Sequence, residues 1–542
     1  MNNAIYNFPP PVNEPVLSYL KGSAERKNLE AELQRQMSIV VDIPMIINGK
    51  EVRNHNTDVV RMPHNHSHIL ATYSKATEKE VEIAIEAAMN AHKLWADLSW
   101  TVRASITLKA AELIAGKYRA LMNAATMLGQ SKNIYQAEID AVCETIDFLK
   151  FNAYFATTIY EMQPNSAFNQ LNKMEYRPLE GFVFTVSPFN FTSIASNLNM
   201  SPVLMGNTTV WKPATTSLLS NYYLMKIFQE AGLPDGVVNF LPGPGSLIGK
   251  KVLSSPELAG IHFTGSNNTF NFLWQEVARQ LPHYKSYPRL IGETGGKNFL
   301  FMHPSADPLE VAVNAYRGAF EYQGQKCSAA SRLYIPESKW PEVKSELLRI
   351  AKEAKMGDVT DPQNFINAVI DEASFENTMN YIRYAAGSPE AEIIAGGQGD
   401  KSKGYFIEPT IVVTTNPKFK TMEEEIFAPV LTVYIYPDNQ LEETIDLCNH
   451  TSPYGLTGAV FSRDRVKASE ICEKLRYAAG NFYINDKPTG AVVGLQPFGG
   501  SRASGTNDKA GGEFNLIRWI NPRTIKETFQ PATEFRYNYM FE

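Results

Sequence analysis

The stretch GFVFTVSPFN at residues 181–190 decides the fold class, because a short apolar, β-rich run ends there in a polar loop. Three similar runs follow, with longer helical patterns between them: TTVWKP at 208–213, VVNFLPG at 237–243 and IHFTGS at 261–266. Such alternation is typical of an α/β fold with a parallel sheet and crossover helices. Ligands of these sheets bind at the carboxyl ends of the strands. The four loops that follow the runs therefore predict a binding site.

Helical patterns precede this region, and a second α/β region follows it. We expect an exposed helix over Ala24–Gln36, and residues 77–160 look largely helical from the capping-box pair Thr77 and Glu80 onward. A second series of strands and helices extends from about 298 to 500, and the tail beyond it is mixed. A chain of 542 residues is too long for one compact core, which predicts two or three structural units.

The composition excludes several classes of function. Lys plus Arg number 51 and Asp plus Glu 57, for a formal net charge of -6 without a long run of either sign. We therefore expect neither a nucleic-acid nor a membrane partner. No apolar run approaches the roughly 18 residues of a membrane span. The 4 cysteines lack disulfide or zinc spacing, so we expect no metal and a reducing compartment: the cytoplasm, or the mitochondrial matrix if the chain is eukaryotic.

Three residues in Gly-containing or strand-end loops could carry chemistry. Cys327, in the run YQGQKCS, has a small polar approach, and Lys326 could favour its thiolate; a lone cysteine is more often a buried small residue. Glu293, in IGETGGK, could be a general base, although a capping or salt-bridged glutamate is commoner. Asn190 could donate its amide to an oxyanion, although loop asparagines usually make turns.

Three histidines alternate in the run PHNHSH at residues 63–68. In an extended strand, His64, His66 and His68 would share one face, a spacing that can bind a metal ion. No carboxylate or thiol accompanies them, and we interpret the segment as an ordinary loop.

Seven segments, in the same order, resemble the motifs of the aldehyde dehydrogenase superfamily over residues from about 40 to 530. They are Ser187–Asn190, Trp211–Ala214, Phe263–Ser266, Glu293–Lys297, Gly324–Cys327, Glu424–Pro429 and Pro497–Gly500. Within the superfamily, the sequence is most similar to the branch that acts on glutamate semialdehyde and its cyclic form, 1-pyrroline-5-carboxylate. Phe270 stands where most members have glycine, and FGGSRASGTND at 498–508 matches that branch's C-terminal signature.

The resemblance implies an aldehyde dehydrogenase-like α/β fold in three parts. Residues 1–162 and 181–297 would form a Rossmann-type NAD-binding domain, with an N-terminal extension to about residue 40. Residues 298–505 would form an α/β catalytic domain. A small oligomerisation hairpin near 163–180, joined by residues 506–542, would bridge the subunits of a homodimer or a higher homo-oligomer.

The resemblance also implies a role for each matched side chain. Cys327 would attack the aldehyde carbon, Asn190 would hold the oxyanion, and Glu293 would activate the water that cleaves the thioester. The residues that would bind NAD are Ser187, Lys212, Gly265, Ser266, Asn267, Asn268, Thr269, Glu425 and Phe427. Many superfamily members have a glutamate where Thr215 stands, so the choice of NAD over NADP rests on the resemblance.

The substrate implied is glutamate 5-semialdehyde, which would be oxidised to glutamate during proline breakdown. The backbone amides of Gly490 and Ala491 and the hydroxyl of Ser328 match the branch's anchor for the substrate carboxylate. Phe191 and Phe498 would pack on the aliphatic part. The branch commonly has serine at the position of Ala491, so one hydroxyl contact is missing here.

Three other functions fit part of the pattern. A dehydrogenase of another semialdehyde, such as succinate semialdehyde, would share every catalytic residue and differ in the anchor. A non-catalytic protein on the same fold would be expected to lack Cys327, Glu293 or Asn190, and all three are present. A cysteine hydrolase would need a histidine partner for the thiol, and we expect none beside the matched motifs.

Overall fold

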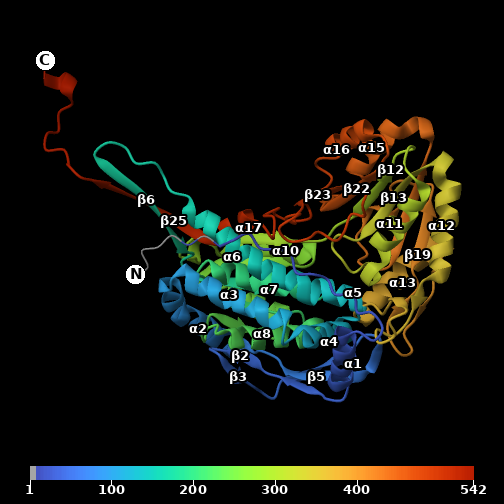
Figure 1. Cartoon of the computed structure of the whole chain (residues 1–542), viewed down its shortest axis with the longest axis horizontal. Coiled ribbons are helices and arrows are strands. Elements are labelled where there is room, and N and C mark those ends of the chain that lie inside the picture. The colour runs from blue at the N-terminus through green and yellow to red at the C-terminus, as the bar shows by residue number, and fades with distance from the viewer. Residues whose placement is uncertain (1–5, 7, 542) are drawn as a thin grey trace.

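The chain forms two lobes, each built on a seven-stranded sheet, and a thin ribbon that projects from one end (Figure 1). This computed structural model describes residue 6 and residues 8–541. Residues 1–5, 7 and 542, which the predicted domain bounds include, lie outside the described part. The predicted α/β class is confirmed.

The sheet of the N-terminal lobe has the strand order β11-β10-β7-β8-β9-β2-β3. Its strands are β2 (Met45–Ile47), β3 (Lys50–Val52), β7 (Phe182–Val186), β8 (Thr209–Lys212), β9 (Val238–Phe240), β10 (Leu258–Thr264) and β11 (Arg289–Glu293). The five strands from β11 to β9 pair in parallel, and β2 joins antiparallel to β9. All four strands expected from the sequence are present. Strand β10 begins earlier than expected, at Leu258, and is buried along its whole length.

Helices cover both faces of this sheet because alternate side chains of a strand point to opposite sides. Phe182 and Phe184 of β7 pack in one apolar cluster with α2, α9 and α10, whereas Val183 packs in another with α6. The helices of the lobe are α1 (Ala24–Met37), α2 (Glu78–Asp97), α3 (Trp100–Ala115), α4 (Arg119–Gln130), α5 (Ile134–Ala137), α6 (Thr145–Glu161), α7 (Thr192–Leu204), α8 (Leu218–Ala231), α9 (Gly245–Leu253) and α10 (Asn267–Gln280). A further sheet outside them contains β1 (Val41–Ile43), β4 (Thr57–Met62) and β5 (Asn65–Ser74).

The helical region differs in detail from the sequence pattern. The capping box at Thr77 and Glu80 is present. Helix α3 ends at Gly116 instead of continuing into α4, since glycine lacks the side chain that favours a helix interior. Between α5 and α6 the chain forms a π-helix, η1 (Glu138–Glu144), which is a form often found at functional sites.

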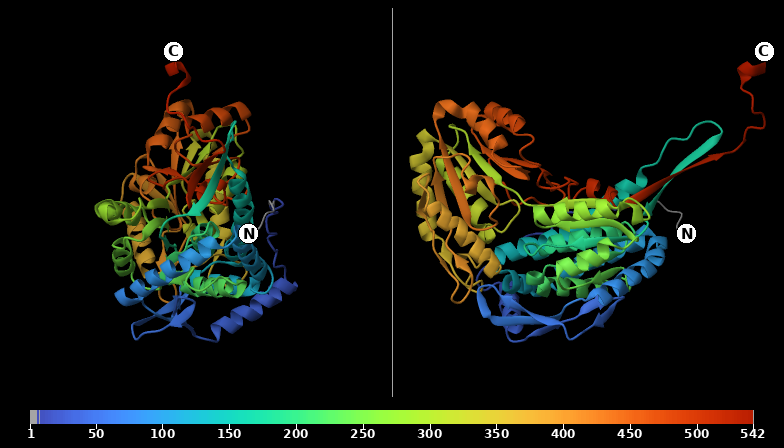
Figure 2. Two further views of the ribbon diagram at one scale, coloured as in Figure 1. Left: turned by 90° about the vertical axis from the view of Figure 1, so that its left-hand side faces the viewer. Right: turned by 180° about the vertical axis from the view of Figure 1, so that it is seen from behind.

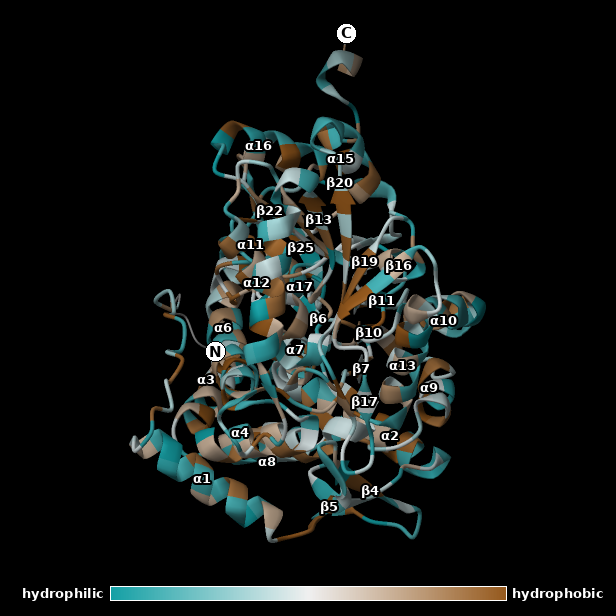
Figure 3. Ribbon diagram, turned by 90° about the vertical axis from the view of Figure 1, so that its right-hand side faces the viewer, coloured by the Kyte–Doolittle hydropathy of each residue, from teal (hydrophilic) through white to brown (hydrophobic). Residues whose placement is uncertain are grey.

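The C-terminal lobe contains the second sheet, in the order β16-β19-β20-β13-β12-β22-β23, parallel except for β16. Its strands are β12 (Asn298–Met302), β13 (Ala330–Pro336), β16 (Ala391–Ala395), β19 (Thr410–Thr414), β20 (Val430–Tyr436), β22 (Thr457–Phe461) and β23 (Asn481–Ile484). The helices are α11 (Pro308–Phe320), α12 (Trp340–Glu353), α13 (Glu372–Ala386), α14 (Lys420–Glu423), α15 (Leu441–His450) and α16 (Arg465–Lys474). Figure 3 shows that β19 and β20 are largely apolar, as expected of strands covered on both faces.

The projecting ribbon consists of two strands that are far apart in the sequence (Figure 2). Strand β6 (Gln170–Pro178) pairs antiparallel with β25 (Ile520–Thr528), which follows the short helix α17 (Glu513–Ile517). The hairpin expected near 163–180 is therefore a single strand completed by the C-terminal segment. The resemblance implied that residues 506–542 join this segment, and β25 is the part of them that pairs with β6.

Gly181, directly before β7, lies where both its backbone angle and its close neighbours require glycine. Its φ is +141°, and a Cβ atom there would lie 2.1 Å from the Glu257 carbonyl oxygen. Gly232 also has a positive φ, +101°, but a Cβ there would meet no atom within 4 Å. We expect Gly232→Ala to lower the free energy of unfolding by about 1–2 kcal/mol, the cost of the left-handed backbone, and Gly181→Ala to lower it by more. Thermal unfolding midpoints of both variants check this, and equal shifts would contradict it.

Candidate active site

A cavity of about 350 Å³ lies where the two lobes meet. Its lining includes Glu293 at the end of β11 and Phe191 just before α7, both from the N-terminal lobe. Cys327, Ser328 and Phe498 line it from the other side. The structure thus brings together the predicted nucleophile, the predicted base and the predicted substrate-binding residues.

The loop that carries Cys327 is held by backbone contacts from several directions. It follows η4 (Glu321–Gly324), in which the non-glycine residues Tyr322 and Gln323 have positive φ angles of 52° and 54°. The Asn298 side-chain amide donates to the carbonyl oxygens of Cys327, at 2.7 Å, and of Ala329, at 2.9 Å. A Cβ atom on Gly296 would lie 2.5 Å from the Cys327 carbonyl oxygen. Only glycine therefore lets this strand end approach the loop so closely.

Cys327 and Glu293 both line the cavity, where each is half-buried and each affects the pKa of the other. Burial, followed by the charge of Glu293 and the hydrogen bond to it, raises the pKa of the Cys327 thiol well above its usual range. Burial also raises the pKa of Glu293 to about 7, although the thiol's hydrogen bond opposes this. The resting nucleophile is therefore a thiol, and the group that can take its proton is a carboxylate that titrates near neutral pH.

Lys326 does not serve the thiol, although it is adjacent in sequence. Its ammonium is buried and faces Glu321, 3.4 Å from a carboxylate oxygen. Burial lowers the pKa of Lys326 to about 8. Lys487 approaches the same carboxylate at 3.7 Å. Both lysines line the cavity, so two cationic groups border its substrate side.

Asn190 lies in the buried loop after β7, beside the cysteine loop. Its side-chain amide donates to the Gln325 carbonyl oxygen at 3.1 Å, two residues before Cys327. This contact ties the two lobes together at the nucleophile. Asn190 itself is not among the residues that line the cavity, whereas its neighbour Phe191 is.

The predicted cofactor residues line the carboxyl ends of the first sheet. Ser187 follows β7 and accepts a hydrogen bond from the Trp211 indole at 2.9 Å. Lys212 ends β8, and burial lowers its pKa to about 8. Among the described residues, no carboxylate lies within ion-pair distance of the Lys212 ammonium. A half-buried cation without an acidic partner fits a polar or anionic ligand at this edge.

The turn at Gly265 begins helix α10. The Ser266 hydroxyl accepts a hydrogen bond from the Thr269 amide and caps the helix, while Asn267 donates to the Ala503 carbonyl at 2.8 Å. Asn268 lies exposed in the first turn. The N-terminus of a helix offers unpaired N–H groups and a positive dipole end, which suits a phosphate.

Glu425 and Phe427 approach this edge from the other lobe. A Glu425 carboxylate oxygen accepts a hydrogen bond from the Gly296 amide at 2.8 Å, and burial raises its pKa to about 7. Phe427, with φ +61°, packs edge-to-face on Phe189 at 5.8 Å between ring centroids. Glu425 thus reaches the segment directly after Glu293.

The predicted carboxylate anchor lies in one loop of the cavity. Ser328 shares a 2.7 Å hydrogen bond with Thr489, the residue before Gly490. Gly490 has φ +95°, which a residue with a side chain rarely adopts. Gly490 and Ala491 both line the cavity.

A buried ionic cluster under Phe191 was missed in the sequence. The Lys132 ammonium lies 2.7 Å from an Asp140 carboxylate and 4.0 Å from the centre of the Phe191 ring. Ser193 donates to Asp140 and to Glu144, whose pKa burial raises to about 8. No local signal reveals this cluster, because its members come from α7 and from segments on both sides of α5.

The histidines do not assemble a metal site. His64 is buried and faces the Ser131 hydroxyl at 3.2 Å, whereas the half-buried His66 lies in strand β5, not in the expected loop, and approaches the Lys401 carbonyl oxygen at 2.9 Å. No group of three or more candidate metal ligands occurs among residues 6 and 8–541. The expectation of no histidine beside a matched motif was wrong, since His262 directly precedes Phe263. Its ring, however, faces the Leu198 carbonyl and Trp519, not the thiol.

The two-lobed fold with a half-buried cysteine–glutamate pair between the lobes defines a class of aldehyde-oxidising enzymes. The chain belongs to the aldehyde dehydrogenase family, whose model matches residues 52–525. It is 50% identical to the mitochondrial delta-1-pyrroline-5-carboxylate dehydrogenase of Dictyostelium discoideum over 540 residues, which is 99% of this chain and 97% of that protein. It is 48% identical to the Homo sapiens protein of the same name over 529 residues, 97% of this chain and 94% of that protein.

Solved structures give the same relationship. The delta-pyrroline-5-carboxylate dehydrogenase of Mycobacterium tuberculosis bound with NAD has a TM-score of 0.96 and 48% identity, covering 99% of this chain and 100% of that chain. The Thermus 1-pyrroline-5-carboxylate dehydrogenase with bound NAD has a TM-score of 0.91 and 32% identity, covering 97% and 100%. In the described part of this chain, no helix is long and apolar enough to cross a membrane.

Replacing Glu293 by glutamine tests the electrostatics of the pair. The neutral amide removes the negative charge that helps to raise the thiol pKa, so we expect Cys327 to be alkylated at lower pH in Glu293→Gln than in the unmodified protein. The measurement is the rate of iodoacetamide modification of Cys327 as a function of pH, followed by mass spectrometry. Glu144→Gln is the control: Glu144 has the smallest of the named effects on the thiol, so its shift should be smaller. An unchanged pH midpoint in Glu293→Gln would contradict the account.

Proposed function

We propose that this protein oxidises L-glutamate 5-semialdehyde, the open form of 1-pyrroline-5-carboxylate, to L-glutamate with NAD, a step of proline degradation. The observation that carries the proposal is the cavity itself. The Cys327–Glu293 pair lines it together with the Gly490–Ala491 loop and Ser328. Relatives at 48% and 50% identity over nearly the full chain carry the name of this activity.

The chain's own residues supply the acid–base and nucleophilic chemistry. Glu293 accepts the Cys327 proton as the sulfur adds to the aldehyde carbon, and the carbonyl oxygen becomes an oxyanion. The Cys327 amide and the Asn190 side chain would hold that oxyanion. Bound NAD supplies the oxidant that converts the resulting thiohemiacetal to a thioester. Glu293 releases that proton to solvent and then takes a proton from water, whose oxygen attacks the thioester carbon. The same carboxyl returns its proton to the departing sulfur, which releases the acid and the thiol.

The residues at the edge of the first sheet fit NAD. Lys212 offers an ammonium without an acidic partner among the described residues, and Ser266 to Thr269 offer the N-terminus of a helix. Glu425 offers a carboxylate for ribose hydroxyls from the opposite lobe. Thr215 places no negative charge near the ribose. Thr215 would therefore not repel the additional phosphate of NADP. The preference for NAD is supported instead by the relatives that were crystallised with it.

The substrate side of the cavity fits a short amino acid with an aldehyde. The amides of Gly490 and Ala491 would hold the carboxylate with the Ser328 hydroxyl, and Phe191 and Phe498 would flank the methylene groups. Succinate semialdehyde remains the alternative substrate, since it presents a carboxylate and an aldehyde to the same residues.

We also propose the assembly and location that the sequence suggested. The ribbon of β6 and β25 projects from the lobes, as a bridging element of a homodimer or a higher homo-oligomer would. Residues 181–297 and most of the preceding chain would bind NAD, and residues 298–505 would carry catalysis. In a eukaryote the mitochondrial matrix is the expected location, since the Dictyostelium and human relatives are named as mitochondrial proteins; otherwise it is the cytoplasm.

Substrate choice tests the proposal directly. We expect kcat/KM for NADH formation with 1-pyrroline-5-carboxylate to exceed that with propanal by at least about tenfold, since a bound carboxylate contributes roughly 1.5–3 kcal/mol. It should also exceed that with succinate semialdehyde, by a smaller factor, because that substrate shares the carboxylate and lacks only the amino group. Cys327→Ala should abolish activity with all three. Equal rates with the three aldehydes would contradict the substrate, and activity that survives in the variant would contradict the nucleophile.

The pH dependence follows from Glu293. It works as a carboxylate and its pKa is raised to about 7, so activity should rise with pH through about 7 and fall about tenfold per unit well below it. Propanal is the suitable substrate, because opening of the pyrroline ring depends on pH itself. In Glu293→Gln we expect thioester hydrolysis to slow by about 10²- to 10⁴-fold. Stopped flow should still show a first turnover of NADH, formed more slowly because the Cys327 proton has also lost its acceptor, before a steady state limited by the slower hydrolysis. A variant that keeps the normal profile would exclude Glu293 as the base.

A further inference from the structure

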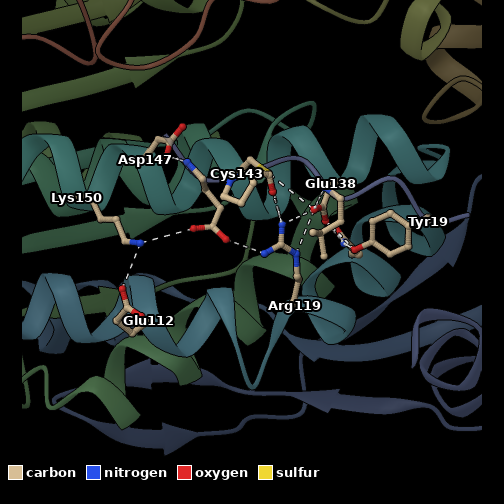
Figure 4. Close-up of polar contacts among 11 residues, drawn as sticks. Tyr19, Glu112, Arg119, Glu138, Cys143, Asp147 and Lys150 are labelled. Carbon is tan, nitrogen blue, oxygen red and sulfur yellow. Dashed lines mark hydrogen bonds and ion pairs between the residues drawn. The ribbon is translucent and has the colours of Figure 1, made fainter. Parts of the chain in front are cut away.

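Residues 12–20, the N-terminal strap, lie without regular secondary structure over the helices of the N-terminal lobe. Figure 4 shows the polar contacts that fix this strap, in which Tyr19, Arg119 and Glu138 converge. The Tyr19 hydroxyl donates to Glu138 at 2.8 Å, and the Leu17 amide donates to the same carboxylate at 3.1 Å. Arg119 pairs with Glu138 and, at 2.8 Å, with Glu14 of the strap. These contacts hold the strap on α4 and η1.

The other end of the strap reaches the active-site cavity. The Asn13 side-chain amide donates to an Asp147 carboxylate oxygen at 2.8 Å and to the Val493 carbonyl oxygen at 2.8 Å. The Glu14 amide donates to the other Asp147 oxygen at 2.7 Å. Asp147 lies in α6 and is 3% exposed. Asn13 therefore links a helix of one lobe to a loop that is 480 residues away in the sequence.

That loop is the one that contains the proposed carboxylate anchor. Its first support is the Ser328–Thr489 hydrogen bond. Its last is Gly494, where a Cβ atom would lie 2.1 Å from the Phe151 ring. Between these two points, the backbone of residues 490–493 accepts one hydrogen bond from a described side chain outside the loop, that of Asn13.

We propose that Asn13 is a positioning residue for substrate recognition: it fixes the backbone of residues 490–493 so that the Gly490 and Ala491 amides face the substrate carboxylate. The inference rests on the proposed function for the identity of the carboxylate. It predicts a defect in binding rather than in chemistry, because Asn13 contacts neither Cys327 nor Glu293.

Steady-state kinetics of three variants test the inference. In Asn13→Ala we expect KM for 1-pyrroline-5-carboxylate to rise about three- to tenfold, the effect of losing one hydrogen bond. The kcat and the KM for propanal, which lacks a carboxylate, should stay within about twofold. Asn13→Asp keeps the size of the side chain but cannot donate to Val493 and faces Asp147, so its KM should rise at least as much. Tyr19→Phe loosens the strap at Glu138, away from the loop, and should leave both KM values unchanged.

Hydrogen–deuterium exchange separates the inference from the proposed function. Residues 492–496 close a turn on the Val492 carbonyl, and their amides should exchange faster in Asn13→Ala than in the unmodified protein or in Tyr19→Phe. Unchanged exchange, or an equal rise in KM for propanal, would overturn the inference. Faster exchange in a protein that shows no preference for 1-pyrroline-5-carboxylate would instead overturn the proposed substrate and leave the positioning role supported.

Discussion

The short crossing between the two sheets is the constraint on which the catalytic centre depends. Strand β11 ends at Glu293 in the first sheet, and β12 begins at Asn298 in the second. One end of this segment fixes the base, and the other end holds the loop of the nucleophile. Gly295 and Gly296 allow the crossing, because a Cβ atom would lie 2.0 Å from a Glu425 carboxylate oxygen or 2.5 Å from the Cys327 carbonyl. The distance between base and thiol is therefore set by the backbone.

Burial between the lobes then determines the charge of each group. It raises the thiol pKa of Cys327 well above its usual range and the carboxyl pKa of Glu293 to about 7. A thiolate formed without substrate would lie beside a carboxylate in a place of low polarity, which costs free energy. Cys327 therefore keeps its proton until an electrophile arrives. The same carboxylate can then accept a proton from sulfur and, once it has released that proton, another from water, because a pKa of about 7 allows both protonation states near neutral pH.

The parts of the fold that depend on nearby residues could be predicted from the sequence. Strand β7 at residues 182–186 and the capping box at Thr77 are examples, because apolar runs and caps are local patterns. The positions of Glu293 and Cys327 came from motifs. The strand register of the ribbon, the cluster of Lys132 and Asp140, and the exact partner of Asn190 could not be predicted. Each depends on chain segments that meet only after folding, and periodicity carries no information about such pairs.

The catalytic residues and the substrate-binding loop also differ in how far along the chain their supporting contacts lie. The nucleophile and the base are placed by a crossing of a few residues and by the loop that packs against it. The loop of Gly490 and Ala491 is instead supported from the chain's first twenty residues, through Asn13, and from α6. Changes in the strap can therefore alter which aldehyde is held without moving the group that attacks it. A conserved chemistry with variable substrates is what such an arrangement permits, because recognition and reaction rest on separate backbone supports.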